Sequence, residues 1–329
     1  MVLEKQDRLE SNPLTLKETS TPEPGLQEVR IKVSVCGVCR TDLHVVEGEL
    51  PVHKLPLIPG HQIVGRIDKL GRGVTNWRGG ERVGVPWLYK TCGNCRYCRR
   101  GRENLCEYAL FTGYDADGGF AEYTVAPADF VYRLPANYSD LEVAPLLCAG
   151  VIGYQALHAT GLRDRGKLGL FGFGSSAHIV IQMARYRGLR VYVVSRTERE
   201  LDLARKLGAH WVGHIDDDMG VLLDAGIVFA PSGELLVESL KKLDKGGRIV
   251  SAGIYTTPLP GFDYSLIYPE KCLTSIAHTT RENVRAFLTV AAEFKISTQS
   301  NVYELEDANL ALLNIKNSRV SGSTILKIV

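Results

Sequence analysis

The chain has no marked excess of charge of either sign, no long apolar run and no apolar leader segment. Its 39 Lys and Arg residues nearly balance 37 Asp and Glu residues, which leaves a net charge of +2. This balance gives no reason to expect nucleic acid or an anionic membrane surface as the main partner. No stretch of about 18 apolar residues could span a bilayer, and the residues after Met1 lack the apolar run of a signal peptide. We therefore expect a cytoplasmic protein without membrane or nucleic-acid partners.

Internal repeats and low-complexity segments are also missing. The 329 residues are 45% hydrophobic and 23% charged, which is the composition of a globular protein, and this length favours two domains. Residues 1–148 contain short alternating strands and many glycine turns, which predict a mostly-β domain. Residues 149–278 alternate strand and helix patterns, which predicts an α/β domain with a doubly wound parallel sheet. Residues 279–329 have the texture of the first domain, and we assign them to it.

The pattern also predicts the main elements of the second half of the chain. The expected strands cover residues 167–172, 190–195, 227–230, 248–252 and 273–277. The expected helices cover residues 145–157, 176–187, 198–207, 233–243 and 281–293, and short strands ending at 324–329 follow the last helix.

Eight cysteines in a long chain without a secretion signal favour metal binding or catalysis over disulfides. Four of them, separated by two, two and seven residues, lie on one short loop covering residues 92–106: Cys92, Cys95, Cys98 and Cys106. Four thiolates at this spacing can close a tetrahedral shell around Zn²⁺ without an open position, which predicts a structural zinc site. An iron–sulfur cluster is the chemical alternative, although the long last gap and the missing following proline disfavour the bacterial ferredoxin pattern. Disulfides or unused thiols are the remaining alternative.

Reactive side chains are concentrated in the stretch Cys36–His44, at the end of a predicted strand. The stretch holds two thiols, a guanidinium, a hydroxyl, a carboxylate and an imidazole, and rigid scaffolds commonly present active sites in this way. His61 follows a Pro-Gly turn, and a lone histidine is usually structural. With Cys39 and Cys148, however, His61 would form a Cys2His zinc set whose fourth position is open to water or substrate. Spacing alone does not distinguish Cys39 from Cys36 as the first ligand.

A glycine-rich turn between a predicted strand and a predicted helix fits the pattern G-x-G-x-x-A. Gly172 permits the tight turn, Gly174 lets a pyrophosphate approach the backbone, and Ala177 allows the helix to pack closely on the strand. The amide groups at the start of the helix, around Ser175 and Ser176, would then face the anion. In this strand–turn–helix–strand context the motif predicts a dinucleotide site.

The end of the next strand indicates which nucleotide binds. An NAD site usually has Asp or Glu there, which binds the ribose 2′-hydroxyl. Here Ser195 and Arg196 stand at the strand end, with Arg199 a turn later, and no carboxylate directly follows the strand. Because a guanidinium pairs well with a phosphate, we expect NADP(H). The alternative is that Arg196 stacks over the adenine of NAD(H).

With these motifs in this order, the sequence resembles the zinc-dependent medium-chain alcohol dehydrogenase family. The resemblance covers nearly the whole chain and is carried by residues 37–44, 59–61, 84–106, 118–123 and 144–150 and by the turn at Gly172 and Gly174. It implies a GroES-like catalytic domain, a Rossmann domain, one catalytic and one structural zinc ion, and hydride transfer between an alcohol and a nicotinamide cofactor. The family also suggests a homodimer or a homotetramer.

The resemblance assigns the first zinc ligand to Cys39, which directly precedes Arg40, rather than to Cys36. It implies that Arg40 contacts the cofactor pyrophosphate and that the hydroxyl of Thr41 bonds the substrate oxygen. It also implies that Asp42 orients the zinc-binding histidine, a role that a carboxylate beside a metal ligand commonly has.

Two further residues match the family and three depart from it. His44 matches the imidazole at the outer end of a proton relay, and Trp87 matches an aromatic wall of the substrate pocket. Gln62 stands where the family usually has Glu after the zinc histidine, and Ile152 where it often has Thr behind the nicotinamide. Gly322-Ser323 stands where some members have an Arg that reaches the pyrophosphate.

These features predict an NADP(H)-preferring, zinc-dependent alcohol dehydrogenase or aldehyde reductase acting on small to medium alcohols, aldehydes and ketones. An NAD-dependent member of the same family is the nearest alternative. A catalytically silent, NADPH-binding redox sensor with the same fold is the other, and the complete set of Cys39, His61 and Cys148 argues against it.

Overall fold

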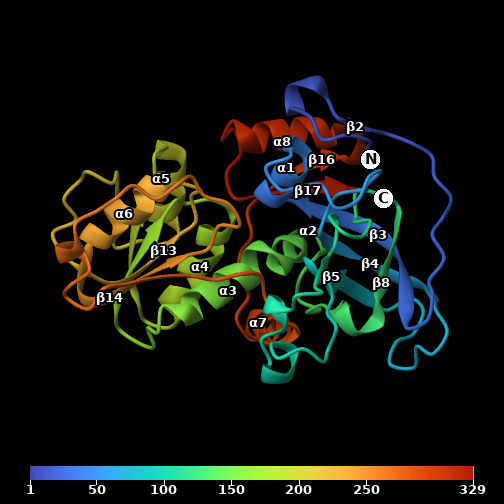
Figure 1. The fold of residues 1–329 in the computed structure, drawn as a ribbon, viewed down its shortest axis with the longest axis horizontal. Coiled ribbons are helices and arrows are strands. Elements are labelled where there is room, and N and C mark those ends of the chain that lie inside the picture. Colours follow the sequence, from blue (N-terminus) through green and yellow to red (C-terminus); the bar gives the residue numbers. More distant parts are fainter. Residues whose placement is uncertain (329) are drawn as a thin grey trace. The chain divides into compact units, whose positions relative to one another are not determined.

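A computed structural model describes residues 1–328 of the chain. These residues divide into two compact units. The first unit contains Met1–Cys148 and the chain from His278 onward, and the second contains Ala149–Ala277 (Figure 1). His278 thus belongs to the first unit, whereas the sequence pattern placed the boundary one residue later.

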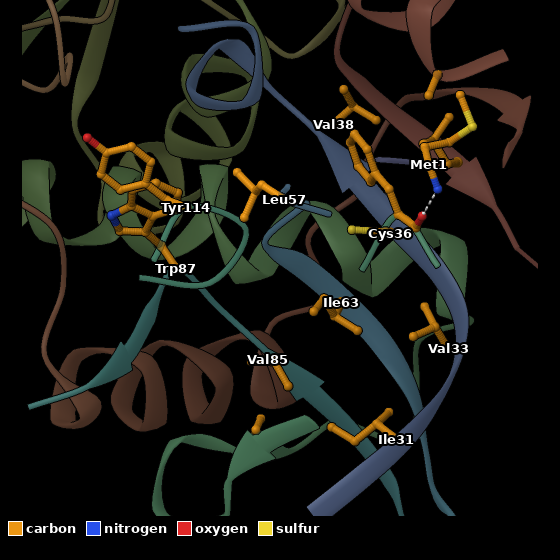
Figure 2. Close-up of a cluster of buried hydrophobic side chains, with 14 of the residues drawn as sticks. Met1, Ile31, Val33, Cys36, Val38, Leu57, Ile63, Val85, Trp87 and Tyr114 are labelled. Carbon is orange, nitrogen blue, oxygen red and sulfur yellow. Dashed lines mark hydrogen bonds between the residues drawn. The ribbon is translucent and has the colours of Figure 1, made fainter. Parts of the chain in front are cut away.

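The first unit is built on a seven-stranded sheet with the strand order β16-β17-β3-β4-β5-β9, in which β8 also pairs with β3. Only β16 and β17 are parallel neighbours. Val29, Ile31 and Val33 of β3 are fully buried, as their alternation with polar residues predicts, and Figure 2 shows Ile31 and Val33 in the core with Ile63 and Val85. The strands are β3 Glu28–Val38, β4 Gln62–Leu70, β5 Arg82–Val85, β8 Tyr123–Pro127, β9 Tyr132–Arg133, β16 Ser300–Glu304 and β17 Ser323–Lys327.

Shorter elements surround this sheet. Two antiparallel pairs join β1 Val2–Leu3 to β2 Leu14–Thr15 and β6 Leu88–Lys90 to β7 Leu110–Phe111. The α-helices are α1 Arg40–Glu47, α2 Asp140–Val143, α7 Arg281–Glu293 and α8 Ala308–Lys316. The prediction of only short strands after α7 is wrong for α8. This helix buries Ala308, Ala311 and Leu312, which share one helical face.

The second unit confirms the predicted doubly wound parallel sheet. Its six strands are all parallel and follow the order β12-β11-β10-β13-β14-β15. They are β10 Lys167–Phe171, β11 Arg190–Val194, β12 Trp211–Gly213, β13 Leu223–Val228, β14 Leu243–Ser251 and β15 Cys272–Ser275. The helices are α3 Ala149–Ala159, α4 Ser175–Tyr186, α5 Glu198–Lys206 and α6 Gly233–Lys241. The strand order reverses at β10, whose neighbours are β11 and β13, and ligands of such sheets bind at this switch point.

Within residues 1–328, no single helix is long and apolar enough to cross a membrane. One bent pair of helical segments, residues 140–147 and 149–159, meets the criterion jointly, by length and composition only.

Candidate metal and nucleotide sites

Cys39, His61 and Cys148 converge in the first unit, although 87 residues separate the last two. The Nε2 atom of His61 lies 3.4 Å from the Sγ atom of Cys39 and 3.3 Å from that of Cys148. Around a tetrahedral zinc ion, ligand atoms are about 3.5 to 3.8 Å apart, given Zn–S and Zn–N bonds of about 2.3 and 2.0 Å. Three donors at these separations fit a zinc ion and leave its fourth position open. Cys36 is not part of this group.

A buried carboxylate fixes the orientation of the histidine. The Nδ1–H group of His61 donates to Oδ1 of Asp42 at 2.9 Å, and both side chains are almost fully buried. With Nδ1 occupied in this way, Nε2 faces the two thiols, which is the tautomer that a metal ligand requires. The geometry therefore gives Asp42 the orienting position that the resemblance implied.

Cys39 also caps the helix α1. Its Sγ atom accepts a hydrogen bond from the backbone N–H of Thr41 at 3.3 Å, and its own N–H donates to Oδ2 of Asp42 at 2.8 Å. A helix N-terminus stabilises negative charge, so this position favours a thiolate. The same short helix carries Arg40, which is half-buried, and His44, which is buried.

The three donors are electrostatically coupled. A hydrogen bond between the two thiols holds the pKa of Cys39 well below its ordinary value and raises that of Cys148 well above it. Burial lowers the pKa of His61, but the charges of Asp42 and Cys39 outweigh it and raise that pKa to about 10. Because a histidine ligand must be neutral, a cation bound here would displace this proton.

A second carboxylate contacts the proposed proton relay. Glu49 lies just beyond α1, and its carboxylate accepts a hydrogen bond from Nδ1 of His44. The His44 side chain is 6% exposed, whereas that of Glu49 is 40% exposed. The pair thus connects a buried imidazole to solvent. The sequence analysis missed Glu49, because no periodic pattern links a residue to another five positions later, beyond the end of its helix.

Trp87 lies beside the Cys2His group, within a cluster of rings. Its indole meets the ring of His61 edge-on, with 4.9 Å between the centroids and 77° between the planes. It stacks on Phe111 at 5.2 Å, on Tyr114 at 5.9 Å and on His278 at 6.3 Å. Figure 2 shows Trp87 and Tyr114 lying against each other beside the buried core. Phe111 and His278 were not identified from the sequence, since they come from distant segments.

The four cysteines of the loop 92–106 also converge. The Sγ atom of Cys92 lies 3.5 Å from that of Cys106 and 3.9 Å from that of Cys98, again close to the edges of a zinc tetrahedron. Backbone N–H groups donate to these sulfurs, among them that of Cys95 to Cys92 at 3.4 Å. All eight cysteines are unpaired, so disulfides do not account for them. Four sulfurs leave no open position, which fits a structural metal.

In the second unit, the loop from β10 to α4 has the backbone that the glycine pattern predicts. Gly172 has φ +85°, a left-handed conformation, and its N–H donates to the carbonyl of Val194 at 2.8 Å. Gly174 is the N-cap of α4, no side chain caps the helix, and no atom lies within 4 Å of where a Cβ of Gly174 would be. Ser175 and Ser176 form the first turn, and Ala177 is fully buried. The loop therefore leaves room for a phosphate group at a helix N-terminus.

The end of β11 differs from expectation. Ser195 is buried and donates its hydroxyl hydrogen to the carboxylate of Glu200 in α5, while Arg196 is exposed. A carboxylate therefore does stand beside this strand end in space, and the sequence analysis missed it. The signal was readable: the N-cap Thr197, three residues before Glu200, begins a capping-box pattern.

The departures from the family pattern have different surroundings. Gln62 is 3% exposed, and among residues 1–328 its Nε2 atom has no hydrogen-bond partner. Ile152 is half-buried in α3. Gly322 has φ +73° and precedes Ser323, the first residue of β17.

Together, a β unit with an open Cys2His group and a closed four-cysteine group and a doubly wound unit with a phosphate-binding turn define a class. They are the parts of a metal-dependent oxidoreductase that uses a dinucleotide cofactor.

Comparisons with known proteins identify the family. The family model described as "Alcohol dehydrogenase GroES-like domain" matches residues 25–136, and that described as "Zinc-binding dehydrogenase" matches residues 177–293. The chain is 45% identical to the "Probable alcohol dehydrogenase AdhA" of Mycobacterium tuberculosis over 97% of this chain and 94% of the relative. It is 38% identical to an alcohol dehydrogenase of Geobacillus stearothermophilus over 96% of each chain. A cinnamyl alcohol dehydrogenase structure from Sorghum bicolor, 30% identical, superposes with a TM-score of 0.91 over 98% of this chain and 95% of the other.

The chain therefore belongs to the zinc-dependent medium-chain alcohol dehydrogenase family. Its first unit is the GroES-like domain, its second is the Rossmann-type domain, and its activity is that of an alcohol dehydrogenase.

Proposed function

We propose that this alcohol dehydrogenase prefers NADP(H) and interconverts small to medium alcohols with aldehydes and ketones at the Cys39–His61–Cys148 group. The observation that carries this proposal is the convergence of two thiols and one imidazole on an open fourth position. The four-cysteine group of the loop 92–106 would hold a second, structural zinc ion, and the protein would be a homodimer or homotetramer.

Zinc at the Cys2His group would act as a Lewis acid on the substrate oxygen and lower the pKa of a bound hydroxyl. The protein residues around it orient the groups and move the proton. Asp42 holds Nε2 of His61 toward the two thiols. Thr41, in the first turn of α1, would bond the substrate oxygen.

The proton would leave through His44. Its hydrogen bond with Glu49 supports this route, because Glu49 is exposed and a carboxylate can pass the proton to water. Arg40, the first residue of α1, would bind the cofactor pyrophosphate.

Arg196 is the main support for NADP(H). It is exposed directly after β11, where a guanidinium can pair with the 2′-phosphate, and Ser195 offers a hydroxyl beside it. Glu200 favours the second candidate, an NAD(H)-dependent enzyme, because its carboxylate beside Ser195 would repel a 2′-phosphate and could accept a hydrogen bond from a ribose hydroxyl.

Steady-state assays with both cofactors test the proposal, using a panel of alcohols and aldehydes. We expect kcat/KM for NADPH to exceed that for NADH, and the double variant Ser195→Asp with Arg196→Gly to reverse this preference. Glu200→Gln is the matched control: it removes the competing carboxylate and should strengthen the preference for NADPH. An unchanged cofactor ratio in the double variant would refute the role of Ser195 and Arg196.

Metal analysis tests the zinc assignments. We expect two zinc ions per chain in the wild type and one in Cys39→Ala. A single zinc ion per chain that survives Cys39→Ala would contradict the catalytic site.

A further inference from the structure

His278 has a backbone conformation that is unusual for its residue type. Its φ is +52°, in the left-handed region that favours glycine. A histidine kept in this conformation has a conformational cost that glycine would avoid, and such residues are often found at ligand-binding sites. The side chain of His278 is therefore the feature to explain.

That side chain extends the ring cluster beside the Cys2His group. The imidazole lies 4.4 Å from the ring of Phe111, with 38° between the planes, and stacks on Trp87 at 29°. No hydrogen bond joins its ring nitrogens to any group of residues 1–328. Burial lowers the pKa of His278 to about 4, so at neutral pH the ring offers one hydrogen-bond donor and one acceptor.

Trp87 provides a second, independent observation. The side chain is nine-tenths buried, and its Nε1 atom has no hydrogen-bond partner within residues 1–328. Buried indole N–H groups usually have a partner, and leaving one without it costs free energy. Since the other side of this indole meets His61, an acceptor that satisfied Nε1 would lie beside the proposed metal ligand.

We propose that Trp87, Phe111 and His278 form a substrate-recognition wall that selects planar aromatic alcohols and aldehydes bearing a hydrogen-bonding ring substituent. The inference rests on the proposed function, because it assigns the substrate class of that same site. A flat aromatic ring gains stacking contacts on this wall that a flexible alkyl chain cannot match. The indole N–H and the neutral imidazole supply the polar contacts that distinguish a phenolic ring from an unsubstituted one.

The variant His278→Gly tests this wall without a folding penalty, because glycine readily adopts the positive φ. We would measure kcat and KM for 4-hydroxybenzaldehyde, benzaldehyde and hexanal, with NADPH and NADH each at saturation. The wild type should prefer 4-hydroxybenzaldehyde to hexanal, and His278→Gly should lower that kcat/KM ratio by about tenfold, mainly through KM. Glu270→Gly is the matched control, since Glu270 has φ +59° and is exposed; its ratio should equal that of the wild type.

His278→Asn separates the ring from its polarity. Asparagine tolerates the left-handed conformation and keeps a donor and an acceptor but has no aromatic ring. We expect it to lose the preference for benzaldehyde over hexanal while keeping part of the preference for the hydroxylated ring. Equal substrate ratios in the wild type, His278→Gly and His278→Asn would overturn the inference while leaving the proposed function intact. No turnover of any aldehyde or alcohol by zinc-loaded wild type would overturn the proposed function and this inference with it.

Discussion

At the scale of single residues, Asp42 shows how one buried carboxylate serves two neighbours. One oxygen accepts from His61 and the other from the backbone of Cys39, so the same side chain orients two proposed metal ligands. Neither contact is visible in the sequence, although the proximity of Asp42 to Cys39 is. The carboxylate therefore links the end of a strand to a histidine 19 residues later.

We predict that Asp42→Asn weakens zinc binding at the Cys2His group by about 10- to 100-fold, the usual effect of removing a carboxylate behind a histidine ligand. The amide still fits the site but no longer carries the charge that favours the bound state. Competition with a chromogenic chelator measures the affinity. Glu49→Gln serves as the control, since Glu49 contacts His44 and no ligand. Equal affinities in Asp42→Asn and the wild type would contradict the orienting role.

His178, in α4, gives a pH prediction. Burial lowers its pKa from 6.5 to about 4, whereas an unfolded chain would take up the proton near pH 6.5. Between these values the unfolded state binds more protons, so the free energy of unfolding is full above pH 6.5 and falls as the pH decreases toward 4. The loss is on the order of 3 kcal/mol. Urea denaturation at pH 7 and pH 5 should show a smaller pH difference for His178→Leu than for the wild type; equal differences would contradict it.

The sequence allowed some site residues to be predicted and not others. The four cysteines of the loop 92–106 and the glycines of the β10–α4 turn lie close together in the chain, so local spacing carries their geometry. Cys39 and Cys36 could not be distinguished by spacing, because the turn into α1 decides which thiol joins His61. Glu49, Glu200 and His278 come into place only through folding.

At the scale of elements, the same difference recurs. The long apolar strands of the second unit were predicted because they are buried on both faces. The three-residue strand β12 was missed because its hydrophobic pattern is too short to recognise. The helix α1 was missed because its chemistry-bearing residues disturb the apolar period, and its capping box uses a cysteine instead of Ser or Thr.

The cysteine loop is attached to α7 by one ion pair, which gives a prediction at this scale. Glu103 accepts from the backbone N–H and the guanidinium of Arg281 at 2.7 to 3.1 Å, and its side chain is 11% exposed. Burial raises the pKa of Glu103, but the bonds from Arg281 outweigh it and the pKa is lowered. The pair therefore stabilises the fold above pH 4.5, and this contribution is lost as the pH falls below that value.

We predict that Glu103→Gln lowers the free energy of unfolding at pH 7 by about 1 to 3 kcal/mol, because it leaves the half-buried guanidinium with a neutral partner. Chemical denaturation measures the change, and the difference from the wild type should shrink toward pH 4. Glu107→Gln is the matched control, since Glu107 is exposed and lies 3.9 Å from Arg96. An effect of Glu103→Gln no larger than that of the control would refute the prediction.

At the scale of the whole molecule, the second unit is a continuous insertion, Ala149–Ala277, between two segments of the first. Both proposed metal groups lie in the first unit and the phosphate-binding turn lies in the second. Metal and dinucleotide should therefore stabilise different parts of the chain, because a ligand stabilises the state and the region that bind it.

Hydrogen–deuterium exchange measured by mass spectrometry can resolve these two effects. We predict that removing zinc with a chelator speeds exchange in the loop 92–106 and in α1, because each loses the cation that holds its thiolates together. NADPH added to the zinc-loaded protein should slow exchange at the start of α4 and after β11, where the phosphate groups would bind. A zinc-loaded sample with adenine alone is the control, since it lacks the phosphates. If the chelator and NADPH altered exchange evenly across both units, the assignment of the metal groups to one and the dinucleotide to the other would fail.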